Sequence, residues 1–142
     1  MSTPSSSTSI NINEYKNFVQ SVTSQESDSL TAFMTRIQSL EDQKQAKVPL
    51  LMTSAIGLSS ETGEFNEIVK KIIFQGKPLT EDNIFHMKRE LGDIMWYWIN
   101  ACRALDLDPN AVIQENIEKL TKRYPDKKFD SFFSENRKSG DL

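Results

Sequence analysis

Two pairs of acidic residues at helical spacing lie on apolar helix faces, where unpaired charge is costly. The pairs are Glu61 with Glu64 and Glu90 with Asp93. A helix turns about 100° per residue, so Glu61 and Glu90 project among apolar side chains while their partners border them. Carboxylates are almost never fully buried unless paired or metal-bound, so four that face a helical core require cations. The apolar neighbours are Phe65, Ile68 and Ile72 in the first segment and Ile94, Tyr97 and Ala101 in the second.

Acids three positions apart are also common on exposed helix faces, where they bind nothing. One such pair favours that interpretation, whereas two pairs on the apolar flanks of long helical segments favour a metal site. Carboxylate oxygens without a cysteine or histidine cluster indicate Mg²⁺ or Mn²⁺ rather than zinc. The single histidine, His86, lies one turn before Glu90. It either orients that carboxylate or occupies an ordinary surface position.

The apolar spacing predicts helices throughout and no strands, because no stretch shows sustained period-two alternation. We expect an all-α bundle of four to five helices, preceded by a disordered N-terminus at 1–10. The helical domain covers 11–125, and a partly ordered tail at 126–142 contains Phe129, Phe132 and Phe133. Proline, glycine and capping residues mark the helix ends. The expected helices start at Asn11 for about three turns and then cover 30–40, 49–75, 80–105 and 109–124.

Length, charge and cysteine content exclude several classes of protein. The 142 residues suit a single domain, and seventeen basic against twenty acidic residues give a net charge of −3. That balance argues against a nonspecific binder of long nucleic acid. No apolar run approaches a membrane span, and the Ser/Thr-rich start lacks a signal sequence. With Cys102 as the only cysteine, we expect a cytoplasmic protein without an internal disulfide.

Three of the five glycines lie inside the two acidic helices, at Gly57, Gly63 and Gly92. Glycine in a helix interior costs about 1 kcal/mol relative to alanine. Either tight helix packing or the close approach of a ligand accounts for this cost.

The second acidic helix is apolar nearly all round from Ile94 to Cys102. Its side opposite the acids carries Trp96, together with Phe85 and Ile99. A helix that is apolar on every face has to be buried on every face, which a single chain of this size does not achieve. We therefore predict a homo-oligomer, a dimer or a tetramer, with the Trp96 side at an interface.

Three segments carry a resemblance to a known family. They are GLSSETGEFNEIVKK at 57–71, ELGDIMWYW at 90–98 and ENIEKLTKRYP at 115–125. Together they resemble the MazG family of all-α nucleoside triphosphate pyrophosphohydrolases over roughly residues 48–125. The whole chain is most similar to the short single-domain MazG proteins of cyanobacterial phages. Ser60 stands where the family commonly has a second adjacent glutamate, which leaves the number of metal ions open.

The resemblance implies hydrolysis of a nucleoside triphosphate, a small-molecule partner, to the monophosphate and pyrophosphate. It implies that Glu61, Glu64, Glu90 and Asp93 bind two or more Mg²⁺ or Mn²⁺ ions while a water attacks the α-phosphorus. Glu61 and Glu64 are then the catalytic residues, and we expect Glu61 to receive the proton of the water. The resemblance favours deoxynucleotides, dGTP and dCTP first, and a location in the host cytoplasm if the protein comes from a phage.

Substrate contacts are expected from two further places. Asn116, Lys119 and Arg123 follow spacings of three and four, so they share one side of the last long helix. They match the phosphate-contacting stretch of the family, although scattered basic residues on a solvated face have the same spacing. Tyr97 lies one turn beyond Asp93, where it either contacts sugar or base or belongs to the core.

A regulatory protein that binds a nucleotide or a guanosine alarmone with little or no hydrolysis is the alternative function. The four acids argue against it, because a pure binder does not need ligands for hydrolytic metals. A purely structural helical module with an accidental acidic face ranks last.

Overall fold

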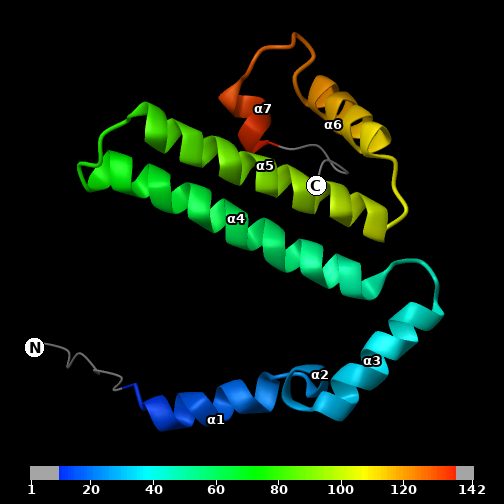
Figure 1. Ribbon diagram of the computed structural model, residues 1–142. Coiled ribbons are helices and arrows are strands. Elements are labelled where there is room, and N and C mark those ends of the chain that lie inside the picture. The colour runs from blue at the N-terminus through cyan, green and yellow to red at the C-terminus, as the bar shows by residue number, and fades with distance from the viewer. Residues whose placement is uncertain (1–9, 137–142) are drawn as a thin grey trace, which may run out of the picture. The chain divides into compact units, whose positions relative to one another are not determined.

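The computed structural model describes residues 10–136, and all of their regular structure is helical (Figure 1). This confirms the all-α class. The long helices begin and end within two residues of the predicted positions. The short helices α2 and α7 were not predicted. The helices are α1 (Ile12–Val22), α2 (Gln25–Asp28), α3 (Leu30–Asp42), α4 (Val48–Phe74), α5 (Glu81–Ala104), α6 (Pro109–Arg123) and α7 (Ser131–Glu135).

The contacts within the chain divide it into two units, with a boundary between Asp42 and Gln43. The first unit contains α1 to α3, and the second contains α4 to α7. The disorder expected at 1–10 falls, apart from Ile10, outside the described residues, as does the end of the tail at 137–142.

The first unit has little apolar burial of its own. In α1 the side chain of Asn11 accepts hydrogen bonds from the N–H groups of Asn13 and Glu14 at 3.0 and 3.5 Å, which caps the helix. The apolar stripe of α1, which includes Tyr15 and Phe18, is exposed. The short helix α2 packs against α3.

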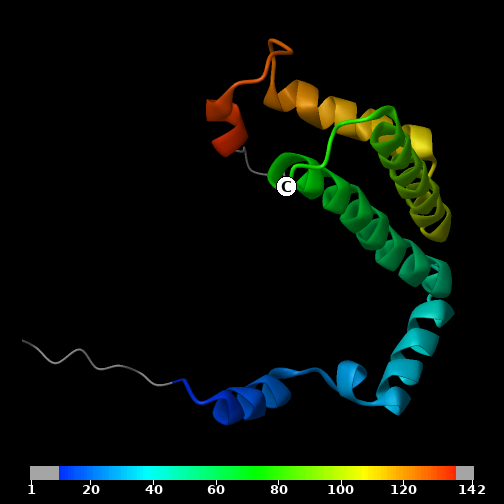
Figure 2. The ribbon, with the colours of Figure 1, turned by 60° about the vertical axis from the view of Figure 1, so that its left-hand side comes forward.

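A long antiparallel hairpin of α4 and α5 forms the centre of the second unit (Figures 1 and 2). Gly76 takes a φ of 69° after α4, a conformation that glycine adopts without strain. The buried Asn83 then fixes the turn, because its Nδ2 donates to the Pro78 carbonyl at 2.7 Å. Its backbone N–H donates to the capping Thr80 hydroxyl at 3.3 Å. The turn therefore sets the register of the two helices.

The open end of the hairpin is closed by a backbone hydrogen bond from the Lys47 N–H to the Ala104 carbonyl at 2.8 Å. Val48, Cys102 and Ala104 are buried there. Among the described residues these three are the only hydrophobic side chains that are buried, so α4 and α5 do not form an extensive core by themselves.

The helix α6 begins where the sequence predicts, because the Asp108 carboxylate accepts from the Asn110 N–H at 2.9 Å and Pro109 occupies the first turn. The tail is aromatic as expected, and Phe129 packs on Tyr124 with ring centroids 5.9 Å apart. Phe129 remains 78% exposed, so only a small part of its ring is covered by this contact. Within the described residues, no helix has the length and apolar character needed to cross a membrane.

Candidate metal centre

The hairpin brings the two acidic pairs together. Glu61 and Glu64 lie on α4, and Glu90 lies on α5. One carboxylate oxygen from each of these three residues lies within 4.8 Å of the other two. Asp93 acts electrostatically on Glu61 and completes what we call the acidic cluster, Glu61, Glu64, Glu90 and Asp93. Glu61 and Asp93 are equally distant from Lys77 in the sequence, and so are Glu64 and Glu90. Because the chain turns back near Lys77, these residues come to lie opposite each other on the two helices.

The electrostatics of the acidic cluster centre on Glu61. Partial burial is the largest cause that raises the pKa of Glu61 above its ordinary value. The negative charge of Glu64 is next, followed by the charges of Asp93 and Glu90. A hydrogen bond between the carboxyl groups of Glu61 and Glu90 acts in the same direction. All of the charges named here are negative, so the cluster is held together against its own repulsion and favours a cation.

The donor set fits a hard divalent cation. Three carboxylate oxygens that converge from two helices, without sulfur or imidazole among them, are the ligands that Mg²⁺ and Mn²⁺ prefer. Glu61 and Glu90 are half-buried and Glu64 is exposed, so one side of the cluster is open to solvent.

A second acidic group on the same helix is neutralised by the protein itself. Glu67, two turns from Glu61, forms ion pairs with Lys70 and with Lys71, the latter at 3.2 Å. Hydrogen bonds from these two lysines lower the pKa of Glu67. The lysines that flank the first acidic pair therefore engage Glu67, as residues of a solvated helix face do.

Gly57 explains how Tyr97 fits between the helices. A Cβ atom at Gly57 would lie 2.1 Å from Cε1 of Tyr97, so only glycine leaves room for this ring. The ring of Trp96 packs edge-on against the ring of Tyr97, with centroids 4.8 Å apart. Tight packing, one of the two explanations for the helix glycines, therefore applies at Gly57. Tyr97 is half-buried and lies one turn beyond Asp93 on α5.

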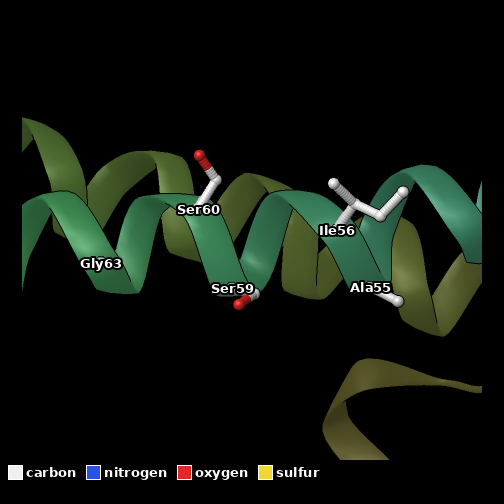
Figure 3. Close-up of a pocket in the computed structure, with 5 residues that line it drawn as sticks. All are labelled: Ala55, Ile56, Ser59, Ser60 and Gly63. Carbon is white, nitrogen blue, oxygen red and sulfur yellow. The ribbon is translucent and has the colours of Figure 1, made fainter. Parts of the chain in front are cut away.

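The other two helix glycines face open space. A Cβ atom at Gly63 or Gly92 would meet no atom within 4 Å. Gly63 lines an open hollow on α4 that is bordered by α4 residues alone (Figure 3). Ser60 borders this hollow as well. The residues that line it are Ala55, Ile56, Ser59, Ser60 and Gly63.

His86 interacts with a different acid from the one suggested by its position. Its Nε2 lies 3.5 Å from Oδ2 of Asp82, one turn earlier in α5, and its ring contacts Phe85. The side chain is 49% exposed. The surface interpretation of His86 therefore fits the structure, and the orientation of Glu90 through His86 does not.

The predicted phosphate-contacting residues lie on α6, in the same unit as the acidic cluster. Lys119 and Arg123 are half-buried, and Asn116 is exposed. Among the described residues, no ion pair or hydrogen bond links Asn116 or Lys119 to the acidic cluster. The structure thus brings the carboxylates together without joining α6 to them.

The contact between Gly57 and Tyr97 is the feature of this centre that the sequence analysis did not identify. The sequence does contain a signal for this contact, because Gly57 and Tyr97 are equally distant from the turn residue Lys77. In an antiparallel helical hairpin such positions face each other. By the same measure of distance from Lys77, Glu61 faces Asp93 and Glu64 faces Glu90.

Comparisons with known proteins relate the chain to one family. The family model of the MazG nucleotide pyrophosphohydrolase domain matches residues 52–127, which is more than half of the chain and includes the whole acidic cluster. The Gene 37 protein of Mycobacterium phage L5 is 38% identical over 69 residues, or 48% of this chain. The match spans 60% of that relative, less than two thirds of its length. No solved structure matches the chain.

Proposed function

The chain belongs to the MazG nucleotide pyrophosphohydrolase family, and on this premise we propose that it converts nucleoside triphosphates to the monophosphate and pyrophosphate. The observation that carries the proposal is the convergence of Glu61, Glu64 and Glu90 within 4.8 Å. The family match covers these residues, and no base among the described residues neutralises them in the way that Lys70 and Lys71 neutralise Glu67.

The acidic cluster is proposed to bind Mg²⁺ or Mn²⁺, two or more ions for each site. When bound, such ions supply positive charge that polarises phosphoryl oxygens and offsets the charge that develops during hydrolysis. Glu61, Glu64, Glu90 and Asp93 hold the ions. The position of Glu61 among the other three acids supports a second role for it.

In the proposed reaction a water oxygen forms a bond to the α-phosphorus, and the bond from that phosphorus to the bridging oxygen of the β-phosphate breaks. Pyrophosphate leaves with the bonding electron pair. Glu61 accepts the proton of the attacking water, with Glu64 beside it as the second catalytic carboxylate. The exposed side of Glu64 gives the triphosphate access to this group.

The remaining triphosphate charge is proposed to meet Asn116, Lys119 and Arg123 of α6. Their common side of the helix, and the partial burial of Lys119 and Arg123, support this assignment. Tyr97 packs between the helices next to Gly57, and its hydroxyl is proposed to contact the sugar or base of the nucleotide.

The protein is further proposed to act as a homo-dimer or homo-tetramer. Trp96 and Phe85 support this because they are 57% and 53% exposed on the second unit. They lie on the same side of α5, and exposed aromatic side chains that gather on one face are typical of protein–protein interfaces.

Pyrophosphate release from a panel of nucleoside and deoxynucleoside triphosphates, with and without Mg²⁺, tests the proposal. We expect metal-dependent release, fastest with dGTP and dCTP, and none in excess chelator. Tight nucleotide or alarmone binding without pyrophosphate release would instead establish the regulatory alternative. The same assay with Mn²⁺ distinguishes a general need for a divalent ion from a preference for one metal.

A further inference from the structure

A buried amide, the side chain of Asn100, lies on α5 beyond Tyr97 as seen from the acidic cluster. Asn100 is only 3% exposed, and the buried residues next along the helix are Cys102 and Ala104. Burying an amide costs free energy unless its polar atoms find hydrogen-bond partners. The partners of Asn100 therefore indicate why a polar residue occupies this position.

Both side-chain partners of Asn100 belong to its own helix. Its Nδ2 donates to the Trp96 carbonyl at 3.1 Å, and its Oδ1 accepts from Nη1 of Arg103 at 2.8 Å. Ser54, the other buried polar residue at this level of the hairpin, donates from its hydroxyl to the Leu50 carbonyl at 2.8 Å. Asn100 thus holds the guanidinium of Arg103 and does not join α5 to α4.

Arg103 is an exposed cation of which one donor is engaged in this way. A guanidinium has five N–H donors in a planar fork, and Asn100 accepts from one of them. Among the residues that the structure describes, no carboxylate forms an ion pair with Arg103. The other donors are therefore available to a ligand. A fork of this kind binds two acceptor atoms that lie side by side in one plane.

The position of Asn100 along α5 relates it to the acidic cluster. Seven residues, close to two full turns, separate Asn100 from Asp93, so the two side chains lie on one line with Tyr97 between them. A rise of about 1.5 Å per residue places the two levels about 10 Å apart, which is comparable to the length of a nucleoside. Arg103 folds back to the level of Asn100 through their hydrogen bond. A nucleotide with its α-phosphate at the acidic cluster can therefore pass Tyr97 with its sugar and reach Arg103 with its base.

The nucleobases differ in whether they present two neighbouring acceptors to such a fork. Guanine presents N7 and O6, and cytosine presents N3 and O2. Adenine has an amino donor beside N7 and beside N1, and thymine and uracil have the N3–H donor between their two carbonyl oxygens. A guanidinium that binds two acceptors at once therefore selects guanine and cytosine over the other bases.

We propose that Arg103 is a specificity-determining residue, whose guanidinium binds the paired acceptors of guanine or cytosine, and that Asn100 is the positioning residue that orients it. This inference rests on the function proposed above, because the acidic cluster sets the place of the α-phosphate. Asn100 acts through Arg103 and does not touch the nucleotide.

Arg103→Lys tests the fork, because lysine keeps the positive charge and loses the planar pair of donors. The measurement is kcat/KM for dGTP relative to dATP and for dCTP relative to dTTP. We expect both ratios to fall at least about tenfold, through the loss of one bidentate contact. An original protein that does not discriminate between these bases would overturn the proposal. Ratios that stay within about twofold in the variant would overturn it too, because a contact with phosphate or a purely structural role affects every nucleotide alike.

Arg89→Lys is the matched control. Arg89 is also an exposed arginine of α5, but it lies on the other side of Asp93 from Arg103. Arg89→Lys should leave both ratios within about twofold of the original protein, which supports a contact made by Arg103 in particular. An equal fall in both variants would overturn the assignment to Arg103.

Asn100→Ala tests the positioning role, because it releases Arg103 without removing it. The ratios should fall about as far as in Arg103→Lys, and the double variant should lower them no further, because both changes remove one interaction. Asn100→Asp, whose carboxylate also accepts from Arg103, should stay within about threefold of the original protein. A double variant that shows the product of the two single effects would overturn the role of Asn100. Arg103 is exposed, so its variants test the fork even if Asn100→Ala does not fold by circular dichroism.

Binding without turnover separates this inference from the proposed reaction. Isothermal titration calorimetry with the α,β-imido analogues of dGTP and dATP, in the presence of Mg²⁺, measures the base preference directly. A preference that Arg103→Lys removes, in a protein that releases no pyrophosphate, supports the base contact and refutes the hydrolysis. Metal-dependent pyrophosphate release with base ratios that do not respond to Arg103→Lys refutes the base contact and leaves the hydrolysis intact.

Discussion

Glu61 and Glu67 lie six residues apart on the same helix, and their carboxylates have opposite electrostatic surroundings. Glu67 pairs with Lys70 and Lys71, which lower its pKa. Glu61 is surrounded by acids, and partial burial together with those acids raises its pKa. The spacing of acids along a helix does not by itself distinguish the two cases. The partners do, because Glu67 finds cations within its own helix and Glu61 finds none among the described residues.

The largest expected effect comes from removing the charge of each glutamate in turn. Glu61→Gln should reduce the rate of pyrophosphate release by roughly 100-fold to 10,000-fold, the usual contribution of a positioned general base. Glu67→Gln should stay within about twofold, because its charge is already neutralised. The measurement is the initial rate at saturating nucleotide and Mg²⁺. Equal losses in both variants would remove the distinction between the two sites.

Metal removal should destabilise the protein through the acidic cluster and not through Glu67. Saturating Mn²⁺ at about 100 times its dissociation constant should stabilise the folded protein by about 2.7 kcal/mol, through mass action. Thermal melts with Mn²⁺ or chelator provide the measurement. Glu67→Gln should keep the response and Glu90→Gln should lose most of it. A metal-independent melting temperature in the original protein contradicts this expectation.

The pH dependence of the metal-free protein should carry opposite signs for the two glutamates. A raised pKa means that the contribution of Glu61 is fully present below the ordinary value of 4.5 and is lost as the pH rises through its folded-state pKa. The lowered pKa of Glu67 gives a contribution that is present above 4.5 and is lost as the pH falls through its folded-state pKa.

Melts in chelator between about pH 3 and pH 8 test both signs. Relative to the original protein, Glu61→Gln should gain stability toward neutral pH, and Glu67→Gln should lose stability there. A Glu61→Gln protein that is less stable than the original at pH 7 in chelator would show that the acidic cluster is not under repulsion.

Gly57 and Gly63 differ in whether a neighbouring side chain occupies the space that a Cβ atom would take. Gly57→Ala forces a Cβ into the ring of Tyr97 and should destabilise the protein by about 1–3 kcal/mol, as overpacking does. Gly63→Ala meets nothing within 4 Å and should stabilise it by up to about 1 kcal/mol through helix propensity. Urea denaturation of the metal-free variants measures both. The same sign for both would show that the hairpin relaxes around Tyr97.

A kinetic effect smaller than that of Glu61→Gln concerns the lysines. Lys119→Ala should raise KM or lower kcat by about tenfold or slightly more, because it removes one charged contact with phosphate. Lys70→Ala is the matched control and should change neither, because Lys70 is paired with Glu67. Steady-state kinetics with dGTP and dCTP provide the comparison. Unchanged kinetics for Lys119→Ala would exclude it from the site.

The helices of this protein could be predicted from sequence because their ends carry local signals. Thr80 caps α5, and Asp108 with Pro109 starts α6. The helix α7 was not predicted, because it has only five residues and one capping aspartate, Asp130. Such short helices depend on their surroundings more than on apolar periodicity.

The acidic cluster was predictable to the level of the helix face but not to the level of contacts. Periodicity places Glu61 and Glu90 on the inner faces of their helices, and the hairpin brings them together. The contact of His86 with Asp82 was not predictable, because residues one turn earlier and one turn later are equally accessible to a helical side chain. The ring of Tyr97 against Gly57 depends on the register, which the turn around Asn83 determines.

Anomalous diffraction from crystals soaked in Mn²⁺ tests the central claim most directly. The account predicts a peak bounded by the carboxylates of Glu61, Glu64 and Glu90, with Asp93 near it, and no peak at Glu67. Carboxylates directed into solvent without a peak between them, in crystals that show Mn²⁺ elsewhere, would contradict it.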